Sequence, residues 1–341
     1  MLSARAAQLA RAVVSLAPLA FLVPRPPRRR EGVSALVRVT GNEEWIEPCL
    51  LSLVGFADEI LVLDNGAAPE TRARFETLGA SLGSAVRRID CVGVDLPEVA
   101  NRGLAESRFR WAFLWDADLV ARTEGPAAVG RLKRFLAGLD PRRFHLVHVR
   151  TTELAGDLRH RFPDARERYD PHVLTADGRA RYVWRARQIP PERAPLGYRP
   201  LRGAAPEHFR ARYDTLKVPK YYSVLRWLEP CIFHVNVKSG RRTLLRHFWL
   251  EWLGSGESIG LEAYTRRRVR ERWDLDDLDA AAARFLEEYC RELEPVDEAA
   301  IGGYPRALAP YVERAAYRVL YSDGRIVGRA ESGLTPGVPA C

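Results

Sequence analysis

Between residues 33 and 120 the chain alternates short apolar, β-branched runs with stretches whose apolar residues recur at helical spacing. We expect strands at 33–39, 60–63, 85–89 and 111–115, and helices at 43–58, 69–82 and 97–107. Such alternation is typical of a parallel sheet with helices on both faces. Ligands of these sheets bind beyond the carboxyl ends of the strands, so the polar residues found there are candidates for function.

Polar turns follow three of the four strands, at residues 40–44, 64–66 and 116–118. In the first turn, Asn42 is expected to cap the helix that follows. In the last turn, Asp116 and Asp118 come directly after an apolar strand, where burying unpaired carboxylates would be costly. Side chains two apart in an extended chain point the same way, which suits two carboxylates that share one divalent cation.

The rest of the chain has a loop-rich part and a helical part. Residues 140–235 are rich in Arg, Pro and Tyr, with strands expected at 144–149, 181–185 and 231–235. Residues 241–293 show helical spacing of apolar positions. We therefore divide the chain into a basic amphipathic arm and linker (1–31), a folded domain (32–240, with halves 32–120 and 121–240), a C-terminal helical extension (241–331) and a disordered tail (332–341).

The net charge of +9 is concentrated near the N-terminus. Residues 1–30 contain six arginines and no acidic residue, and the rest of the chain carries only +3. Apolar residues here line one face of a predicted helix, but the apolar run 12–23 is too short to span a bilayer. Two interpretations remain: the arm binds an anionic membrane surface, or it is a solvated arm without a partner.

Composition narrows the function classes further. The five cysteines are far apart and form no Cys-x-x-Cys pair, which favours a protein of the reducing cytosol. If the arm binds lipid, the protein would be peripheral on the inner face of the cell membrane. Only four of the 53 basic residues are lysines, a skew that says nothing about phosphate recognition. Nucleic acid is disfavoured as a partner because acids line the predicted cleft and no aromatic and basic stripe is evident.

Three segments together resemble the GT-A glycosyltransferases of family 2. They are the first strand with its Asn-Glu-Glu turn (37–46), the second strand ending in Asp64 (59–66), and the Asn-Arg-Gly-Leu-Ala segment (101–105) ahead of the Asp-x-Asp strand (113–118). The resemblance implies a GT-A-like, mostly parallel sheet flanked by helices. It also implies a metal-dependent enzyme that moves a sugar from a nucleoside diphosphate sugar to a polysaccharide, lipid-linked or secondary-metabolite hydroxyl.

Site residues follow from the resemblance at matching positions. The nucleotide sugar would be bound by Thr40, Asn42, Glu44, Asp64, Asn101, Arg102 and Asp116. Mn²⁺ or Mg²⁺ would be held by Asp116 and Asp118, with His234 as the late histidine that many members supply. Its weaker rivals are His172, His208 and His247. An extra glycine, Gly41, departs from the family pattern in the first turn.

An inverting transfer, which the resemblance favours, needs a base for the acceptor hydroxyl. In this family the base often lies in a His-Glu or Glu-Asp pair after an aromatic strand, which here points to Glu192. Pro190 and Pro191 stand where a histidine would be expected. A retaining transfer would require no strong base.

Two other function classes remain open. The Asp-x-Asp pattern also fits haloacid-dehalogenase-like phosphatases, with Asp116 phosphorylated and Asp118 acting as the acid. In that family the motif follows the first strand, whereas here three strands precede it. A non-enzymatic, membrane-associated adaptor would be indifferent to metal and to Asp118→Ala, but it leaves the ordered acidic turns unexplained.

Overall fold

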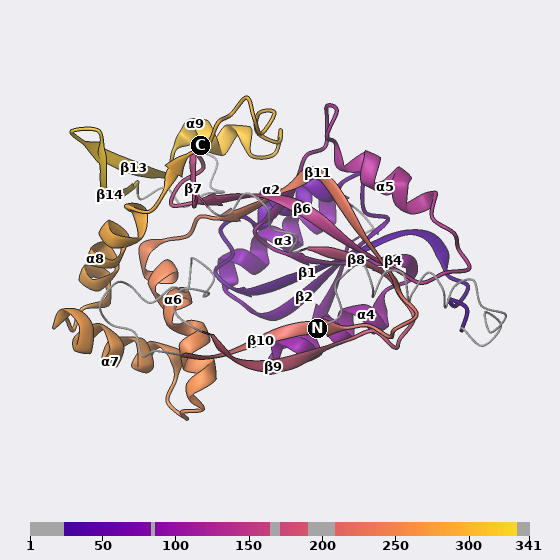
Figure 1. Ribbon diagram of the computed structural model, residues 1–341, viewed down its shortest axis with the longest axis horizontal. Coiled ribbons are helices and arrows are strands. Elements are labelled where there is room, and N and C mark those ends of the chain that lie inside the picture. The colour runs from indigo at the N-terminus through magenta and orange to yellow at the C-terminus, as the bar shows by residue number, and fades with distance from the viewer. Residues whose placement is uncertain (1–23, 83–85, 164–170, 190–208, 333–341) are drawn as a thin grey trace.

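A curled eight-stranded sheet forms the centre of the protein in a computed structural model, which describes residues 24–82, 86–163, 171–189 and 209–332 (Figure 1). The strand order is β3-β2-β1-β4-β8-β6-β11-β5. The strands of this sheet are β1 (Arg30–Gly41), β2 (Glu59–Ala67), β3 (Val86–Asp90), β4 (Phe109–Asp116), β5 (Leu119–Ala121), β6 (His145–Ala155), β8 (His172–Thr175) and β11 (Ser223–Asn236). The helices are α2 (Ile46–Leu53), α3 (Pro69–Leu82), α4 (Leu96–Glu106), α5 (Val129–Ala137), α6 (Gly240–Ser255), α7 (Leu261–Trp273), α8 (Leu278–Cys290) and α9 (Ala309–Arg314).

The first half of the sheet confirms the predicted α/β architecture. Strands β3, β2, β1 and β4 are mutually parallel, and α2, α3 and α4 connect them. Their registers pair Asp64 with Asp90 and Arg38 with Asp116, so the carboxyl ends of all four strands meet at one edge. The predicted polar turns therefore lie at a common edge of the sheet.

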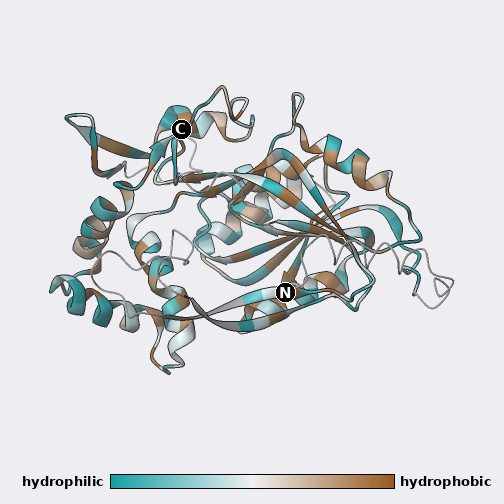
Figure 2. Cartoon of the chain, viewed as in Figure 1, coloured by the Kyte–Doolittle hydropathy of each residue, from teal (hydrophilic) through white to brown (hydrophobic). Residues whose placement is uncertain are grey.

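The side chains of β4 show why this half is stable. Trp111, Phe113 and Trp115 belong to one core cluster, and Ala112 and Leu114 to another. A parallel strand covered on both faces reads as a continuous apolar run because neither face meets water. Figure 2 shows this as strands of the central sheet coloured mostly hydrophobic.

Helix α2 is shorter than the sequence predicts. It begins at Ile46, its N-cap is Trp45, and no side chain caps it, so the prediction that Asn42 is the cap is wrong. The acidic residues expected in its first turn are engaged elsewhere: Glu43 pairs with Arg242, and Glu44 accepts hydrogen bonds from a distant segment. These long-range contacts hold residues 43–45 in a turn ahead of the helix.

The second half of the sheet is mixed rather than parallel. β8 is antiparallel to both β4 and β6, β11 is parallel to β6, and the short β5 is antiparallel to β11. Four of the seven pairings in the sheet are parallel, so the sheet as a whole is mostly parallel. The turn after β4 is short, and it sends β5 back beside β11 instead of into another helical crossover.

A two-stranded hairpin lies beside α4, outside the main sheet (Figure 1). It consists of β9 (Arg181–Ile189) and β10 (Phe209–Lys217). Asn101 of α4 fixes β9, because its Oδ1 accepts from the Tyr182 amide at 2.7 Å and its Nδ2 donates to the Tyr182 carbonyl at 3.1 Å. The chain between the two strands, 190–208, lies outside the described residues.

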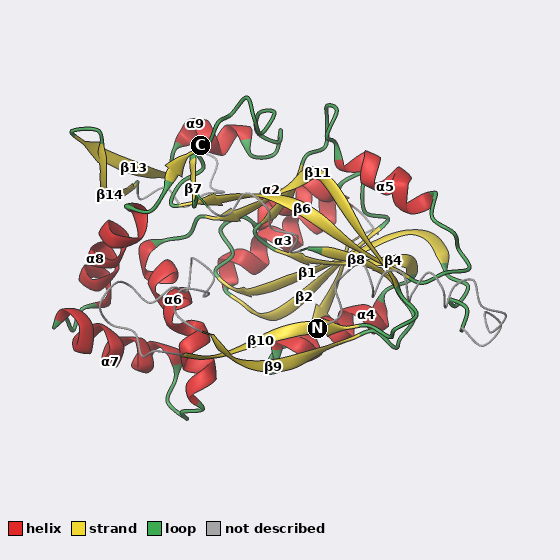
Figure 3. Cartoon of the chain, viewed as in Figure 1, coloured by secondary structure: helices red, strands yellow, loops and turns green. Residues whose placement is uncertain are grey.

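The C-terminal part is helical but also contains strands. Helices α6, α7 and α8 pack together at one end of the molecule around a core that includes Phe248, Val269 and Phe285 (Figure 3). The predicted extension over 241–331 also holds β12 (Glu294–Pro295), which pairs with β7 (His160–Arg161), and the hairpin of β13 (Tyr317–Ser322) and β14 (Arg325–Glu331). Within the described residues, no helix is both long enough and apolar enough to cross a membrane.

Candidate active site

The Asp-x-Asp turn lies at the edge where the carboxyl ends of the parallel strands meet. Asp116 is the last residue of β4, while Asp118 lies in the turn that leads to β5. Because the chain has left the extended conformation at residue 117, the two side chains are not constrained to point the same way. Their carboxylates pair with different basic residues.

Asp116 is held by Arg38 of β1. Arg38 donates from Nε to Oδ1 at 2.7 Å and from Nη2 to Oδ2 at 3.0 Å, a bidentate pair. Its remaining nitrogen, Nη1, reaches Asp214 of β10 at 2.6 Å. Burial would lower the pKa of Arg38, but the two carboxylates raise it beyond its usual value, so the guanidinium stays charged. Arg38 thereby ties the Asp-x-Asp turn to the β9–β10 hairpin.

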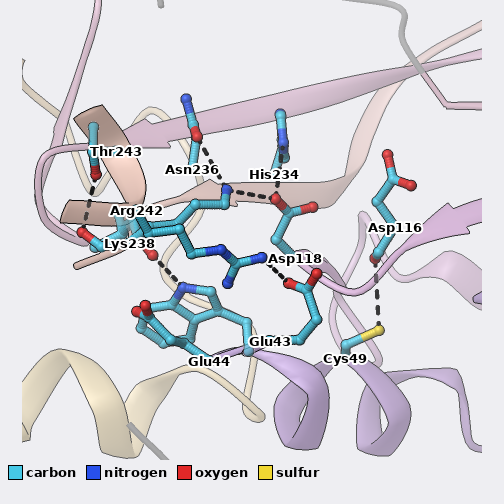
Figure 4. Close-up of polar contacts among 12 residues, drawn as sticks. Glu43, Glu44, Cys49, Asp116, Asp118, His234, Asn236, Lys238, Arg242 and Thr243 are labelled. Atoms are coloured by element: carbon cyan, nitrogen blue, oxygen red, sulfur yellow. Dashed lines mark hydrogen bonds and ion pairs between the residues drawn. The ribbon is translucent and has the colours of Figure 1, made fainter. Parts of the chain in front are cut away.

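Asp118 faces a different set of partners, shown in Figure 4. Its Oδ2 lies 2.8 Å from Nζ of Lys238 and 3.5 Å from Nε2 of His234. Burial would raise the pKa of this carboxyl, but Lys238 and His234 hold it well below its usual value. Its other oxygen, Oδ1, is buried and has no hydrogen-bond partner among the described residues. A buried carboxylate oxygen without a donor is costly unless a water molecule, an ion or a ligand compensates it.

His234 is oriented by a second acid. Its Nδ1 lies 2.8 Å from Oε2 of Glu153, a buried residue on β6 that also accepts a hydrogen bond from Thr151. This leaves Nε2 directed toward Asp118. Burial would lower the pKa of His234, but the carboxylates of Glu153 and Asp118 outweigh it and raise the pKa to about 10. A carboxylate behind the imidazole is the usual way in which proteins orient a metal-binding histidine.

The loop between β11 and α6 positions Lys238. Besides Asp118, its Nζ donates to Oδ1 of Asn236 at 3.1 Å. The backbone carbonyl of Lys238 accepts from Arg329 at 2.7 Å and from Thr243 at 3.2 Å. Trp45, just ahead of α2, donates its indole N–H to the neighbouring carbonyl of Val237. The loop is thus fixed by elements from both ends of the chain.

The first polar turn, residues 40–44, contacts α6 and the loop before it, next to Asp118 and Lys238. Glu43 pairs with Arg242 of α6 at 2.5 Å, and burial raises the pKa of this carboxyl although Arg242 opposes the rise. Glu44 is buried and accepts from the Ser239 amide at 3.0 Å and the Tyr317 hydroxyl at 2.6 Å. The carboxylate of Glu44 is therefore already engaged within the protein.

Asp64 is fully buried on β2, the strand next to β1. Its Oδ1 accepts from the Ala67 amide at 2.8 Å, and its Oδ2 lies 3.1 Å from Nε of Arg72 and 2.7 Å from Nη2 of Arg88. Burial would raise the pKa of this carboxyl, but the amide and the two guanidinium groups lower it. These contacts are structural in this state, and the nucleotide role of Asp64 stays a prediction.

The other predicted nucleotide contacts are scattered over the same edge. Thr40 and Asn42 are exposed in the first turn. Arg102 lies on α4, pairs with Glu98 of the same helix, and has 44% of its side chain exposed. Asn101, also on α4, bonds to the backbone of the hairpin. The structure thus brings Asp118 and His234 together, and it leaves the two α4 residues in a separate group. Glu192 and His208 lie outside the described residues.

Sequence reasoning missed several residues of this group, and no local pattern links them to the motif. Arg38 and Lys238 pair with the two aspartates, while Glu153 pairs with His234 and Arg242 with Glu43. One signal was available for Lys238: in a chain with four lysines among 53 basic residues, it comes shortly after the strand that carries His234.

A divalent cation fits part of the predicted ligand set. Among the described residues there is no group of three or more His, Cys, Asp or Glu side chains arranged as a complete metal site. Asp118 nevertheless offers a carboxylate oxygen that has no partner among the described residues, and the imidazole of His234 lies beside it. His234 would release its proton on binding a cation, because only the neutral imidazole ligates a metal. Mg²⁺ and Mn²⁺ sites in nucleotide enzymes are commonly completed by phosphate oxygens and water, so two protein ligands suffice. Asp116 fits less well, because Arg38 holds both of its oxygens.

Comparisons with known proteins return solved structures alone, since no family model and no curated protein sequence matches the chain. A mannosyltransferase from Pyrobaculum calidifontis, in complex with GDP-Man and Mn²⁺, matches with a TM-score of 0.35 and 14% identity over 91% of this chain and 88% of that one. S. aureus TarS 1–349, in complex with UDP-GlcNAc, matches with a TM-score of 0.36 and 12% identity over 87% of this chain and 96% of that one.

A third match is shorter. Glucosyl-3-phosphoglycerate synthase from Mycobacterium tuberculosis, in complex with Mn²⁺, UDP-Glc and phosphoglyceric acid, has a TM-score of 0.26 and 22% identity. The match covers 37% of this chain and 45% of that one, less than half of its length. The identities and TM-scores of these three matches leave the activity of this chain to be argued from its own residues.

Proposed function

We propose that the protein is a glycosyltransferase that transfers a sugar from a nucleoside diphosphate donor to a hydroxyl acceptor. One observation carries the proposal. The sheet edge predicted to bind ligand holds a buried aspartate, Asp118, with a carboxylate oxygen that lacks a partner among the described residues. Beside it are a carboxylate-oriented imidazole and an ammonium group. This set suits a cation-bound diphosphate better than a neutral ligand.

In this proposal Asp118 and His234 hold Mn²⁺ or Mg²⁺, which supplies positive charge to the leaving diphosphate. The chain's own residues do the remaining work. Glu153 keeps the imidazole oriented, Lys238 adds a second positive charge at the same carboxylate, and Arg38 holds the hairpin against the turn. Positive groups fixed where negative charge develops stabilise the transition state because they need no reorganisation.

The rival functions explain fewer of these contacts. A phosphatase of the haloacid dehalogenase type needs Asp116 as a free nucleophile, whereas Arg38 holds both of its oxygens. A non-enzymatic adaptor has no use for a buried carboxylate oxygen that lacks a donor, which costs stability unless a ligand compensates it. The transferase accounts for both features.

The first experiment is a thermal-shift screen of UDP, GDP, ADP, CDP and dTDP with Mn²⁺, followed by a sugar-transfer assay with the matching donors. We expect one nucleotide to stabilise the protein, by about 2.7 kcal/mol at a concentration 100-fold above its Kd. Asp118→Asn should lose this stabilisation. Asp58→Asn, which removes a partly exposed carboxylate paired with Lys133, is the matched control. If no nucleotide stabilises the wild type, the proposal is wrong.

Stereochemistry and membrane binding are separate parts of the proposal. We propose an inverting transfer with Glu192 as base, which NMR of the product's anomeric proton tests directly; a retained configuration would exclude a base role for Glu192.

We also propose that residues 1–30 bind anionic membrane, because their six arginines are unopposed by any acid. Equal sedimentation with anionic liposomes by the full chain and by a chain lacking 1–30 would refute this.

A further inference from the structure

Lys238 pairs with Asp118, the carboxylate to which the proposed function assigns a divalent cation. Its Nζ lies 2.8 Å from Oδ2 of Asp118, and only 8% of the lysine side chain and 13% of the aspartate side chain are exposed. This is a partly desolvated ion pair, in which each charge is compensated mainly by the other. A cation that approaches Asp118 therefore meets a carboxylate that already has a counter-charge.

The contacts around Lys238 keep its ammonium group in the site. Its backbone carbonyl is held by Arg329 and Thr243, and the adjacent Val237 carbonyl by Trp45. These bonds fix the backbone from which the side chain extends, and withdrawing the ammonium to solvent would break its own hydrogen bonds to Asp118 and Asn236. Its ammonium has three donors, and the described residues supply acceptors for two of them, on Asp118 and Asn236. A further N–H remains for a ligand oxygen.

The charge balance then depends on the nucleotide. A divalent cation that arrives alone is repelled by the ammonium of Lys238 at close range, and this repulsion is large where water is scarce. A diphosphate adds negative charge beside both cations, and it offers an acceptor to the free N–H of Lys238. Each ligand should therefore bind more tightly in the presence of the other, which is a thermodynamic coupling between them.

We propose that Lys238 pairs with Asp118 in the donor-free enzyme and thereby makes divalent cation binding conditional on the nucleotide. This inference rests on the proposed function, because it takes the nucleotide to be the donor's leaving group. It adds that Lys238 is a binding residue whose charge sets the affinity of the site for metal alone.

The test is binding of Mn²⁺ alone, measured from the EPR signal of the free ion, and then binding of Mn²⁺ with the nucleotide selected by the thermal-shift screen. We expect wild type to bind Mn²⁺ at least about tenfold more tightly with the nucleotide than without it. Lys238→Met, which keeps an unbranched side chain as far as the ε position and removes the charge, should tighten the binding of Mn²⁺ alone by at least about tenfold. It should also reduce the coupling.

Two controls keep the outcome unambiguous. Lys133→Met removes a lysine from a more exposed pair with Asp58, and it should leave Mn²⁺ binding unchanged. Lys238→Arg keeps the charge and should keep the coupling. If Lys238→Met does not fold, the wild-type measurement decides: equal Mn²⁺ affinity with and without nucleotide overturns the inference. So does the absence of Mn²⁺ binding both with and without nucleotide, or an unchanged Mn²⁺ affinity in a folded Lys238→Met protein.

Failure of this inference is distinguishable from failure of the proposed function. The effect of Lys238→Met on Mn²⁺ alone is measured without any nucleotide, whereas the proposed function depends on nucleotide binding and sugar transfer. A protein that transfers sugar but shows no effect of Lys238→Met on Mn²⁺ affinity keeps the function and loses the inference.

Discussion

Asp116 and Asp118 are separated by one residue, yet they connect different parts of the protein. Through Arg38, the carboxylate of Asp116 is linked to β10 and the hairpin. The carboxylate of Asp118 is linked to β11 and the loop before α6. The side chain of Asp116 is 44% exposed with both oxygens paired, whereas that of Asp118 is 13% exposed with one oxygen unpaired among the described residues. A short acidic motif can thus divide into a carboxylate whose oxygens are both paired and one that keeps a buried oxygen unpaired among the described residues.

The largest expected difference is between Asp118→Asn and Asp116→Asn. Asp118→Asn should lower sugar transfer at least about 1,000-fold, a loss of about 4 kcal/mol of transition-state stabilisation, and should abolish Mn²⁺-dependent binding of nucleotide. Asp116→Asn should keep Mn²⁺-dependent binding, because that carboxylate is held by Arg38. Nucleotide titrations with and without Mn²⁺ measure both. Loss of Mn²⁺ dependence in both variants would contradict the division between the two aspartates.

Arg38→Met should remove the link between the Asp-x-Asp turn and the β9–β10 hairpin. It leaves the carboxylates of Asp116 and Asp214 without their common partner, and we expect the free energy of unfolding to fall by about 2–3 kcal/mol. Urea unfolding measures this. Arg131→Met is the matched control, because its pair with Glu229 is exposed on both sides and should contribute less than about 1 kcal/mol. Equal effects of the two substitutions would show that Arg38 is no more than a surface residue.

His172 makes the hairpin side sensitive to acid. Burial, together with the neighbouring His148 and Arg38, lowers the pKa of His172 to about 3, and its Nε2 lies 2.6 Å from the Tyr182 hydroxyl. In the unfolded chain the imidazole takes up a proton below about pH 6.5, while in the folded protein it stays neutral until about pH 3. Stability is therefore lost as the pH falls from about 6.5 toward 3.

His172→Phe removes this titration and keeps a flat ring. Between pH 7 and pH 5 the free energy of unfolding should fall by about 2 kcal/mol less in the variant than in wild type, as measured by urea unfolding at the two pH values. His247→Phe, on α6, serves as the comparison for a histidine outside β8. An identical loss of stability in wild type and His172→Phe would exclude this role.

The smallest expected effect is that of Asn101→Ala. The substitution removes both hydrogen bonds to the backbone of Tyr182, and we expect about 1 kcal/mol of destabilisation, because water reaches this partly buried position. Nucleotide binding should change little if Asn101 acts only through the hairpin. A large loss of nucleotide affinity with unchanged stability would instead support the direct contact that the resemblance implies.

The parallel half of the fold was predictable because its determinants are local. Strands β1, β2 and β4 are apolar runs closed by polar turns, and a helix follows each of β1, β2 and β3. The strand predicted over 111–115 is observed as Phe109–Asp116. The other half was not predictable in this way. β8 lies between β4 and β6 but comes after both in the chain, and its four residues carry no turn or periodicity signal that names those neighbours.

The same distinction holds at the site. By itself, the sequence determined the acidic turns, the strand that ends in Asp116 and a histidine at the end of another strand, since these depend on residue types at short spacing. Only the tertiary structure decided which basic group meets which carboxylate. Lys238 is 120 residues from Asp118, and Asp214 is 176 from Arg38. Electrostatic partners are chosen by proximity in the folded chain, and no local pattern encodes such distances.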